Sequence, residues 1–232
     1  MVQMRLKSSR VPSKMLCKIG DHELIYWVMY RLKQTGLNHV IICAAKDNIT
    51  EEFAKKLSYL ADKFGFFLFW GDEDNVAQRF LMAFSAYSES YEVPSGFQIL
   101  RVCGDRPFLE KSFLDSLITN NSDVDIAYNH HYQGRLTGFG YELLGQKLSQ
   151  KIFNLNGETL LNKEHVTLNI YHDTNYICKS FFPTDVPLDR LNEKHKFDLD
   201  THEDIARVNA LVDKLGIKSD TKNIYKALLG IV

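Results

Sequence analysis

The chain has 232 residues, of which 25% are charged and 45% hydrophobic, as in an ordinary globular domain with a sizeable core. The 28 Lys and Arg residues nearly balance the 29 Asp and Glu residues, so the net charge of −1 gives no long-range attraction for nucleic acid or an anionic membrane. No apolar run reaches the length of a membrane span, no secretory signal opens the chain, and the four scattered cysteines form neither a disulfide framework nor a zinc cluster. We therefore expect a cytoplasmic protein without nucleic-acid or membrane partners, in which any anion site is local.

The first half of the sequence alternates short apolar runs with amphipathic segments. Residues 1–4 predict a short strand that runs straight into a basic, serine-containing loop. Apolar runs predict further strands at 39–44, 66–70 and 97–103, and helical spacing predicts helices at 24–36, 50–63 and 75–88. This alternation favours a Rossmann-like α/β fold, with a mostly parallel sheet flanked by helices. Because ligands of such sheets bind beyond the carboxyl ends of the strands, we expect convergence of the loops after Met4, Ala44, Trp70 and Cys103.

The second half of the sequence is less regular. A helix is expected at 111–119 and a strand at 125–129, after which the pattern is irregular as far as Pro187. We interpret the whole chain, 1–232, as a single domain, within which residues 129–187 form a small irregular subdomain or dimer arm. Regular structure returns with a strand-like segment at 197–200, followed by a helix that reaches Leu215.

The loop after the first expected strand concentrates positive charge. It holds four cations and two hydroxyl groups: Arg5, Lys7, Ser8, Ser9, Arg10 and Lys14. Fixed cations and hydroxyl donors suit a triphosphate tail, although four charges on a surface loop are as often merely solvated. The loop is not of the Walker type, because it lacks the glycines that precede a Lys-Ser or Lys-Thr pair.

Two acidic segments follow expected strands. Asp105, in Gly104-Asp105-Arg106-Pro107, ends a central strand, where its carboxylate could hold Mg²⁺ against phosphate oxygens, although Gly-Asp is also common in turns. In residues 198–204, Asp200 or Thr201 could equally be a helix cap. Together with the basic loop, Asp105 and Asp200 make the arrangement that phosphoryl transfer needs, in which magnesium neutralises phosphate charge and aligns the reacting oxygens. The sequence therefore indicates a nucleotidyltransferase.

These residues resemble a known family, the cytidylyltransferases that make CMP-linked acidic sugars, and in particular the branch of the spore-coat polysaccharide biosynthesis protein F. The resemblance covers nearly the whole chain. It is carried by six segments in order, at 5–14, 71–79, 104–107, 138–142, 163–167 and 199–204. The sequence departs from the family pattern at Ser13, where glycine is usual, and at Asn75, where aspartate is usual.

The resemblance implies a reaction and a set of roles. It implies transfer of CMP from CTP to an acidic sugar or related acceptor, with release of pyrophosphate, by a homodimer active in surface polysaccharide biosynthesis. Arg5 and Lys14 would stabilise charge on the triphosphate, and Asp105 and Asp200 would hold Mg²⁺ as the catalytic metal ligands. We expect the remaining nucleotide contacts from Met4, Ser8, Ser9, Arg10, Ala44, Arg79 and Cys103. We expect the acceptor to meet Asn129, Glu142, Glu164 and His165, within the 129–187 segment.

Two other functions stay open on the sequence. The enzyme could use another nucleoside triphosphate, or a sugar phosphate as the acceptor. Alternatively, the chain could be a non-catalytic nucleotide-binding relative, an interpretation that Ser13 and Asn75 favour. Retention of Arg5, Lys14 and both aspartates argues against this second alternative.

Overall fold

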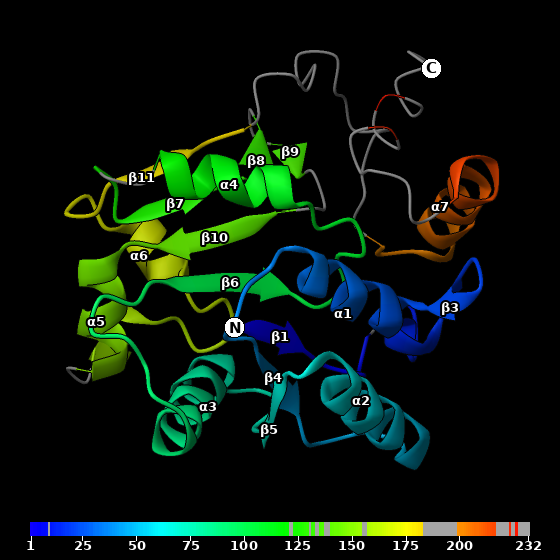
Figure 1. Cartoon of the computed structure of the whole chain (residues 1–232), viewed down its shortest axis with the longest axis horizontal. Coiled ribbons are helices and arrows are strands. Elements are labelled where there is room, and N and C mark those ends of the chain that lie inside the picture. The colour runs from blue at the N-terminus through cyan, green and yellow to red at the C-terminus, as the bar shows by residue number, and fades with distance from the viewer. Residues whose placement is uncertain are drawn as a thin grey trace.

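The computed structural model describes residues 1–8, 10–120, 123–129, 131–132, 135–136, 140–154, 157–182, 199–216, 223 and 226. A seven-stranded sheet, in the order β11-β7-β10-β6-β1-β4-β5, forms its centre (Figure 1). The strands are β1 (Val2–Met4), β4 (Ile41–Ala45), β5 (Phe67–Gly71), β6 (Ile99–Cys103), β7 (Ile126–Tyr128), β10 (Tyr141–Leu144) and β11 (Cys178–Ser180). Strand β10 runs antiparallel to its neighbours β6 and β7, and the other pairs are parallel. The expected mostly parallel α/β sheet is confirmed.

Helices cover both faces of this sheet. They are α1 (Leu24–Gln34), α2 (Glu51–Phe64), α3 (Val76–Ser90), α4 (Lys111–Thr119), α5 (Gln146–Asn154), α6 (Leu168–His172) and α7 (His202–Leu215). Because side chains alternate along a strand, Ile42 and Ala44 join the hydrophobic cluster under α1, α2, α4 and α7, whereas Ile41 and Cys43 join the cluster under α3, α5 and α6. The sheet therefore has a hydrophobic core on each side.

Capping residues fix where two of the helices begin. Thr50 precedes α2, and its side chain accepts a hydrogen bond from Phe53 N at 3.1 Å. Thr201 precedes α7 in a capping box, in which its hydroxyl accepts from Asp204 N while Asp204 accepts from Thr201 N. Because Thr201 caps α7, Asp200 is left to face the loops at the carboxyl edge of the sheet.

The stretch expected to be irregular contains regular elements. Strands β10 and β11 from this stretch join the main sheet, and α5 and α6 pack beneath it. Two small hairpins stand apart from the sheet, β2 (Lys18–Ile19) with β3 (His22–Glu23) and β8 (His131–Tyr132) with β9 (Arg135–Leu136). In the strand-like segment 197–200, Leu199 and Asp200 belong to no strand, and the two residues before them lie outside the described part. Of the helices that the structure describes, none is long and apolar enough to cross a membrane.

Candidate active site

The loops after β1, β4, β5 and β6 lie together at the carboxyl edge of the sheet, as the parallel topology predicts. Glu73, after β5, accepts a hydrogen bond from Asn48 Nδ2 at 2.6 Å and lies 4.0 Å from Lys7 Nζ, so one buried carboxylate joins three of these loops. A cavity of about 240 Å³ opens at the ends of β1 and β6. The expected site residues that line it are Met4, Arg5, Ser8, Arg10, Lys14, Cys103, Asp105, Glu164, His165 and Asp200.

Lys14 is where the basic loop meets the two aspartates. It lies in the short 3-10 helix Lys14–Leu16, and its side chain is only 11% exposed. Its Nζ donates a hydrogen bond to Asp105 Oδ2 at 2.7 Å and lies 3.6 Å from Asp200 Oδ1. Arg10 Nη2 approaches the same Asp200 oxygen at 3.1 Å. The structure thus brings two of the predicted cations and both predicted metal ligands into one cluster.

Gly104 explains how Asp105 reaches this cluster. The Gly104 N–H donates a hydrogen bond of 2.7 Å to the Gln3 carbonyl, which joins the end of β6 to β1. A Cβ atom at position 104 would lie 2.7 Å from that same carbonyl oxygen, closer than van der Waals contact allows. Glycine at this position therefore lets the backbone approach β1 and turn Asp105 toward the basic loop.

Two cations hold Asp105 in its charged form. Burial alone would raise the pKa of the Asp105 carboxyl, but the hydrogen-bonded Lys14 ammonium and the nearby Arg106 bring this pKa below its ordinary value. Arg106 Nη1 also donates a hydrogen bond to the Gly140 carbonyl at 2.9 Å, which anchors it beside the segment that leads into β10. The Asp105 carboxyl therefore carries a negative charge at neutral pH.

Ser13 gives the basic loop its strained turn. Its φ of 53° and ψ of 33° lie in the left-handed region, which glycine adopts readily and other residues avoid. The Ser13 carbonyl accepts a hydrogen bond from Leu16 N at 2.8 Å, which begins the 3-10 helix that carries Lys14. Glycine would adopt this conformation without the steric cost, and serine occupies it here.

Glu142 lies behind the cavity wall and does not line it. This buried side chain of β10 accepts hydrogen bonds from Arg101 Nη1 and from Thr167 Oγ1, both at 2.8 Å. Arg101 Nη2 in turn donates to Gln3 Oε1 at 3.1 Å. Glu142 therefore connects the centre of the sheet with the segment before α6, and in this structure its contacts are with the protein.

The segment 162–167 presents His165 and Glu164 to the cavity. Asn162 Oδ1 accepts hydrogen bonds from the backbone N–H groups of both residues, at 2.8 and 3.1 Å. The next residue, Val166, is buried with a φ of 46°, a conformation that a β-branched side chain rarely adopts. A strained backbone of this kind persists only where its surroundings fix it, and here Thr167 is fixed by Glu142.

Arg79 is fully buried beneath the loop that follows β5. Its Nη1 donates hydrogen bonds to the carbonyls of Asp72 and Glu73. Its Nε and Nη2 find no hydrogen-bond partner among the residues that the structure describes. Desolvation lowers the pKa of this guanidinium, although the group stays a cation. Arg79 therefore keeps unused donors next to a loop at the carboxyl edge of the sheet.

Two further residues lie in the core, Ala44, which was expected to contact the nucleotide, and Asn129, which was expected to contact the acceptor. Ala44 is fully buried within β4. Asn129 is also fully buried, where its Nδ2 donates to the Phe113 carbonyl at 3.2 Å and its Oδ1 accepts from Tyr141 N at 2.6 Å. The Asn129 side chain thus ties β10 to α4. Ser9 lies outside the described residues.

Sequence reasoning missed Arg101 and Gln3, both of which line the cavity. Arg101 carried a usable signal, because it is a charged residue in the middle of an otherwise apolar strand, Ile99–Cys103. Gln3 carried none, since a glutamine in a three-residue strand is unremarkable until the strand is known to lie beside β6.

The two aspartates fit the expected Mg²⁺. Both present an oxygen to the same Lys14 ammonium, so their carboxylates converge from β6 and from the segment before α7. Mg²⁺ prefers oxygen ligands and commonly uses one or two carboxylates together with waters and substrate phosphates. Within the described ranges, no three His, Cys, Asp or Glu side chains gather into a metal site, and Asp105 and Asp200 form a pair of carboxylates. Two carboxylates are enough for a Mg²⁺ ion whose other ligands are waters and substrate phosphates.

Comparisons with known proteins place the chain in a family. The sequence model of the family described as "Cytidylyltransferase" matches residues 1–226. The spore coat polysaccharide biosynthesis protein SpsF of Bacillus subtilis is 26% identical over 223 residues, which cover 94% of this chain and 88% of that protein.

Solved structures share the fold. A cytidylyltransferase from Leptospira borgpetersenii has a TM-score of 0.75 at 20% identity, over 98% of this chain and 91% of that one. CMP:2-keto-3-deoxy-manno-octonic acid synthetase complexed with CTP has a TM-score of 0.56 at 14% identity, over 92% and 97%. Rv0371c of Mycobacterium tuberculosis in complex with manganese has a TM-score of 0.58 at 14% identity, over 90% and 97%. Because the family model matches residues 1–226 of the 232-residue chain, the chain belongs to the cytidylyltransferases, which are CTP-dependent nucleotidyltransferases.

Proposed function

We propose that the protein transfers CMP from CTP to a hydroxyl group of an acidic sugar or a related acceptor, in the biosynthesis of a surface polysaccharide. The observation that carries this proposal is the contact of Lys14 Nζ with Asp105 and Asp200 at the carboxyl edge of the sheet. The relative SpsF, named for spore coat polysaccharide, and the structural similarity to a synthetase that activates a keto-deoxy sugar acid support the acceptor class.

The nucleotide would lie over the basic loop. Arg5, Arg10 and Lys14 supply fixed positive charge for the triphosphate, and Ser8 adds a hydroxyl donor beside it. The buried Arg79 does not line this cavity, so it would support the pyrimidine or the ribose indirectly, by fixing the loop after β5 through the Asp72 and Glu73 carbonyls. Met4, Ala44 and Cys103 belong to the strands beneath the nucleotide, and of these Met4 and Cys103 line the cavity.

The acceptor would enter from the side of His165 and Glu164. Its hydroxyl oxygen attacks the α-phosphorus of CTP, the bond from this phosphorus to the β-phosphate oxygen breaks, and pyrophosphate leaves. The proton of the hydroxyl passes to a base on the acceptor side, where His165 lies. Asn129 and Glu142 would act indirectly, because they hold β10 and the segment 162–167 in place.

Asp105 and Asp200 are the residues that would hold Mg²⁺. The ion would neutralise charge on the phosphates and favour departure of pyrophosphate. The manganese complex of the structurally similar Rv0371c supports a divalent cation in this fold. Lys14, already in contact with both carboxylates, would keep the metal ligands and the α-phosphate close together.

The assembly would be a homodimer, in which segment 129–187 contributes the acceptor pocket and the dimer arm. Light scattering on the purified protein tests the assembly, and a monomer at all concentrations would overturn it.

The test of the function is an assay of pyrophosphate release from CTP and Mg²⁺ with a panel of sugar acids. We expect release with CTP and a single class of sugar acid. The variants Asp105→Asn and Asp200→Asn should lose this turnover while their circular dichroism is unchanged. Asp115→Asn, an exposed carboxylate of α4 that pairs with Lys111, is the matched control and should retain it.

No pyrophosphate release and no CTP binding across the whole panel would refute the proposed function. Release with another triphosphate, or with sugar phosphates alone, would identify one of the alternative nucleotidyltransferases instead.

A further inference from the structure

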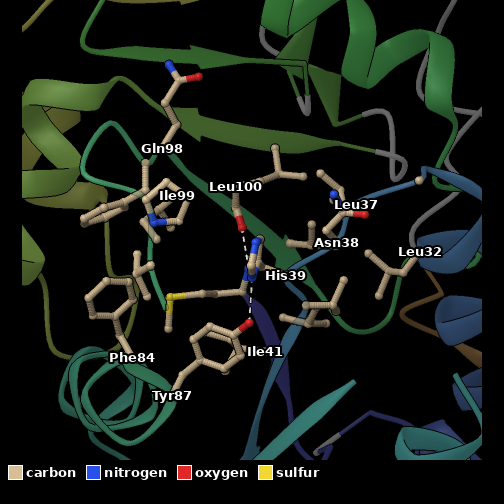
Figure 2. A pocket seen from close by; sticks show the side chains of 18 of the residues that line it. Leu32, Leu37, Asn38, His39, Ile41, Phe84, Tyr87, Gln98, Ile99 and Leu100 are labelled. Atoms are coloured by element: carbon tan, nitrogen blue, oxygen red, sulfur yellow. Dashed lines mark hydrogen bonds between the residues drawn. The ribbon is translucent and has the colours of Figure 1, made fainter. Parts of the chain in front are cut away.

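Two cavities lie at opposite ends of β1, and they differ in the groups that they offer to a ligand. The one away from the candidate active site measures about 420 Å³, and its walls are largely apolar, with Phe84 and Ile99 among the side chains that Figure 2 shows. His39 Nδ1 and Tyr87 Oη, which also line it, lie 2.7 Å apart and satisfy each other. Polar groups without a protein partner lie instead in the cavity of the candidate active site, on the wall that β1 and β6 form.

A polar row of three side chains crosses neighbouring strands at this wall. Gln3 of β1, Arg101 of β6 and Glu142 of β10 each stand between two residues of the hydrophobic cluster under α1, so their own side chains point to the opposite face of the sheet. The segment 162–167 lies over that same face, because Val166 belongs to the cluster under α3, α5 and α6. The polar row is therefore on the side of the sheet from which the acceptor would enter.

The hydrogen bonds along the polar row have a fixed direction, because an arginine guanidinium only donates. Arg101 donates through Nη1 to Glu142 Oε2 at 2.8 Å and through Nη2 to Gln3 at 3.1 Å, so the accepting atom of Gln3 is its amide oxygen. Thr167 Oγ1 donates to Glu142 at 2.8 Å and fixes the far end of the row. The amide nitrogen of Gln3 is consequently turned away from Arg101.

The Gln3 amide nitrogen keeps two free N–H donors, since no residue in the described part of the chain accepts from it. Gln3 lines the cavity together with Glu164 and His165. The Arg101 cation beneath it polarises the amide, which makes these N–H groups stronger donors. Donors that are held in place at a cavity and left unpaired favour a ligand with oxygens that accept hydrogen bonds.

We propose that Gln3 determines acceptor specificity by donating hydrogen bonds from its amide nitrogen to the carboxylate of the acidic sugar, while Arg101 and Glu142 act as positioning residues. This inference rests on the proposed function. The carboxylate is the group of such an acceptor that only accepts hydrogen bonds, whereas its hydroxyl groups also donate. An amide nitrogen that a fixed arginine turns toward the ligand matches a group of the first kind.

The experiment measures pyrophosphate release with CTP and the sugar acid that the unmodified protein uses. Gln3→Met removes the amide at nearly constant volume, and we expect the KM for the sugar acid to rise about 10–100-fold, the typical effect of losing a hydrogen bond to a charged group. The KM for CTP should stay the same. Gln34→Met, at an exposed glutamine that ends α1, is the matched control and should leave both KM values unchanged.

Gln3→Glu separates recognition from folding. Its carboxylate keeps an oxygen for Arg101, so the polar row stays intact, but it offers the acceptor a negative charge in place of the N–H donors. We expect the KM for the sugar acid to rise at least as much as in Gln3→Met, with a melting temperature no lower than that of the unmodified protein. The same sugar with its carboxylate reduced to an alcohol is the second acceptor, and the preference for the acid, measured as kcat/KM, should fall in both variants.

An unchanged KM for the sugar acid in either variant would overturn the assignment of Gln3. Equal losses on the acid and the alcohol would place another group of the acceptor at Gln3, and a higher KM for CTP alone would place the nucleotide there. Both of these results would contradict the proposal while leaving the proposed function in place. If the unmodified protein released no pyrophosphate with any sugar acid, the proposed function itself would fail, and this inference with it.

Discussion

Lys14 is a buried cation held by two carboxylates, and its charge is what keeps those carboxylates together. Without it, Asp105 and Asp200 would repel each other. In the proposed function, a metal ion on the two aspartates would leave this ammonium free for the α-phosphate. Its loss should therefore affect catalysis more than folding.

We predict that Lys14→Met lowers turnover by about 10²–10³-fold, the typical loss for a group that stabilises transition-state charge. Methionine keeps most of the side-chain volume but leaves the two carboxylates without this cation, so we also expect a lower melting temperature, and turnover is compared well below it. Lys18→Met, an exposed lysine of β2, is the control and should retain turnover. Steady-state kinetics of both variants decide the matter, and near-native turnover of Lys14→Met would exclude the assigned role.

At Ser13 we predict a substitution that stabilises the protein. A left-handed conformation costs a non-glycine residue about 1–2 kcal/mol, and glycine loses about 0.5–1 kcal/mol in conformational entropy on folding. Ser13→Gly should therefore raise the free energy of unfolding by up to about 1 kcal/mol, without loss of CTP turnover. Chemical denaturation measures the first and the pyrophosphate assay the second. A destabilised or inactive Ser13→Gly protein would show that the serine side chain itself is required.

The buried Met1 ammonium predicts a pH dependence of stability. Burial brings its pKa from the ordinary 8.0 to about 6, so the folded state favours the neutral amine. The unfolded chain then binds more protons between these values, and stability should rise as the pH rises from about 6 to about 8, by about 2 kcal/mol. Denaturation at pH 6 and pH 8 tests this, and the rise should vanish when the amino group is acetylated. An equal rise in the acetylated protein would assign it to other groups.

At the scale of elements, the segment 162–167 depends on one buried hydrogen bond, from Thr167 to Glu142. Thr167→Val removes the hydroxyl at nearly constant volume. We expect a loss of about 1 kcal/mol in stability and a higher KM for the acceptor, because His165 and Glu164 lose their fixed position. The KM for CTP should stay the same, because the basic loop follows β1 and is separate from segment 162–167. If Thr167→Val raised both KM values equally, its effect would be on the fold as a whole.

Local patterns predicted the elements whose partners are near in sequence. The apolar runs of β4, β5 and β6 and the periodicity of α1 to α4 were all visible, because each element shows its own burial pattern. Strand β10 was not predicted. It has four residues, all buried, with Glu142 among them, and it is fixed by antiparallel pairing with β6 and β7 at long range. A charged residue in a short buried strand hides the pattern on which sequence reasoning depends.

The same distinction applies to the candidate site. Lys14 and Asp105 were predicted because they follow strands whose carboxyl ends meet, whereas Asp200 was predicted from its place before a helix, after an expected strand of which the described residues, Leu199 and Asp200, belong to no strand. Glu142 and Asn129 were expected at the acceptor, yet they form hydrogen bonds with Arg101, Thr167, Phe113 and Tyr141. A motif indicates that a residue matters, whereas packing decides whether it touches a ligand or positions another residue.

At the scale of the whole molecule, β1 connects a polar cavity with a largely apolar one. Its carboxyl end leads into the basic loop, and its other end meets the apolar cavity between β4 and β6. The two cavities are separated along β1 by only its three residues, Val2–Met4. The net charge of −1 gives the whole chain no long-range attraction for a triphosphate. Such attraction would come from the cluster of cations at the carboxyl end of β1.

The most direct test of the central claim is calorimetric titration of the protein with CTP, UTP, ATP and GTP in the presence of Mg²⁺. The account predicts that CTP binds at least about tenfold more tightly than the other three, a difference of about 1.4 kcal/mol. It also predicts that Lys14→Met weakens CTP binding while Lys18→Met does not. Equal affinity for the four triphosphates, or a preference for one other than CTP, would contradict it.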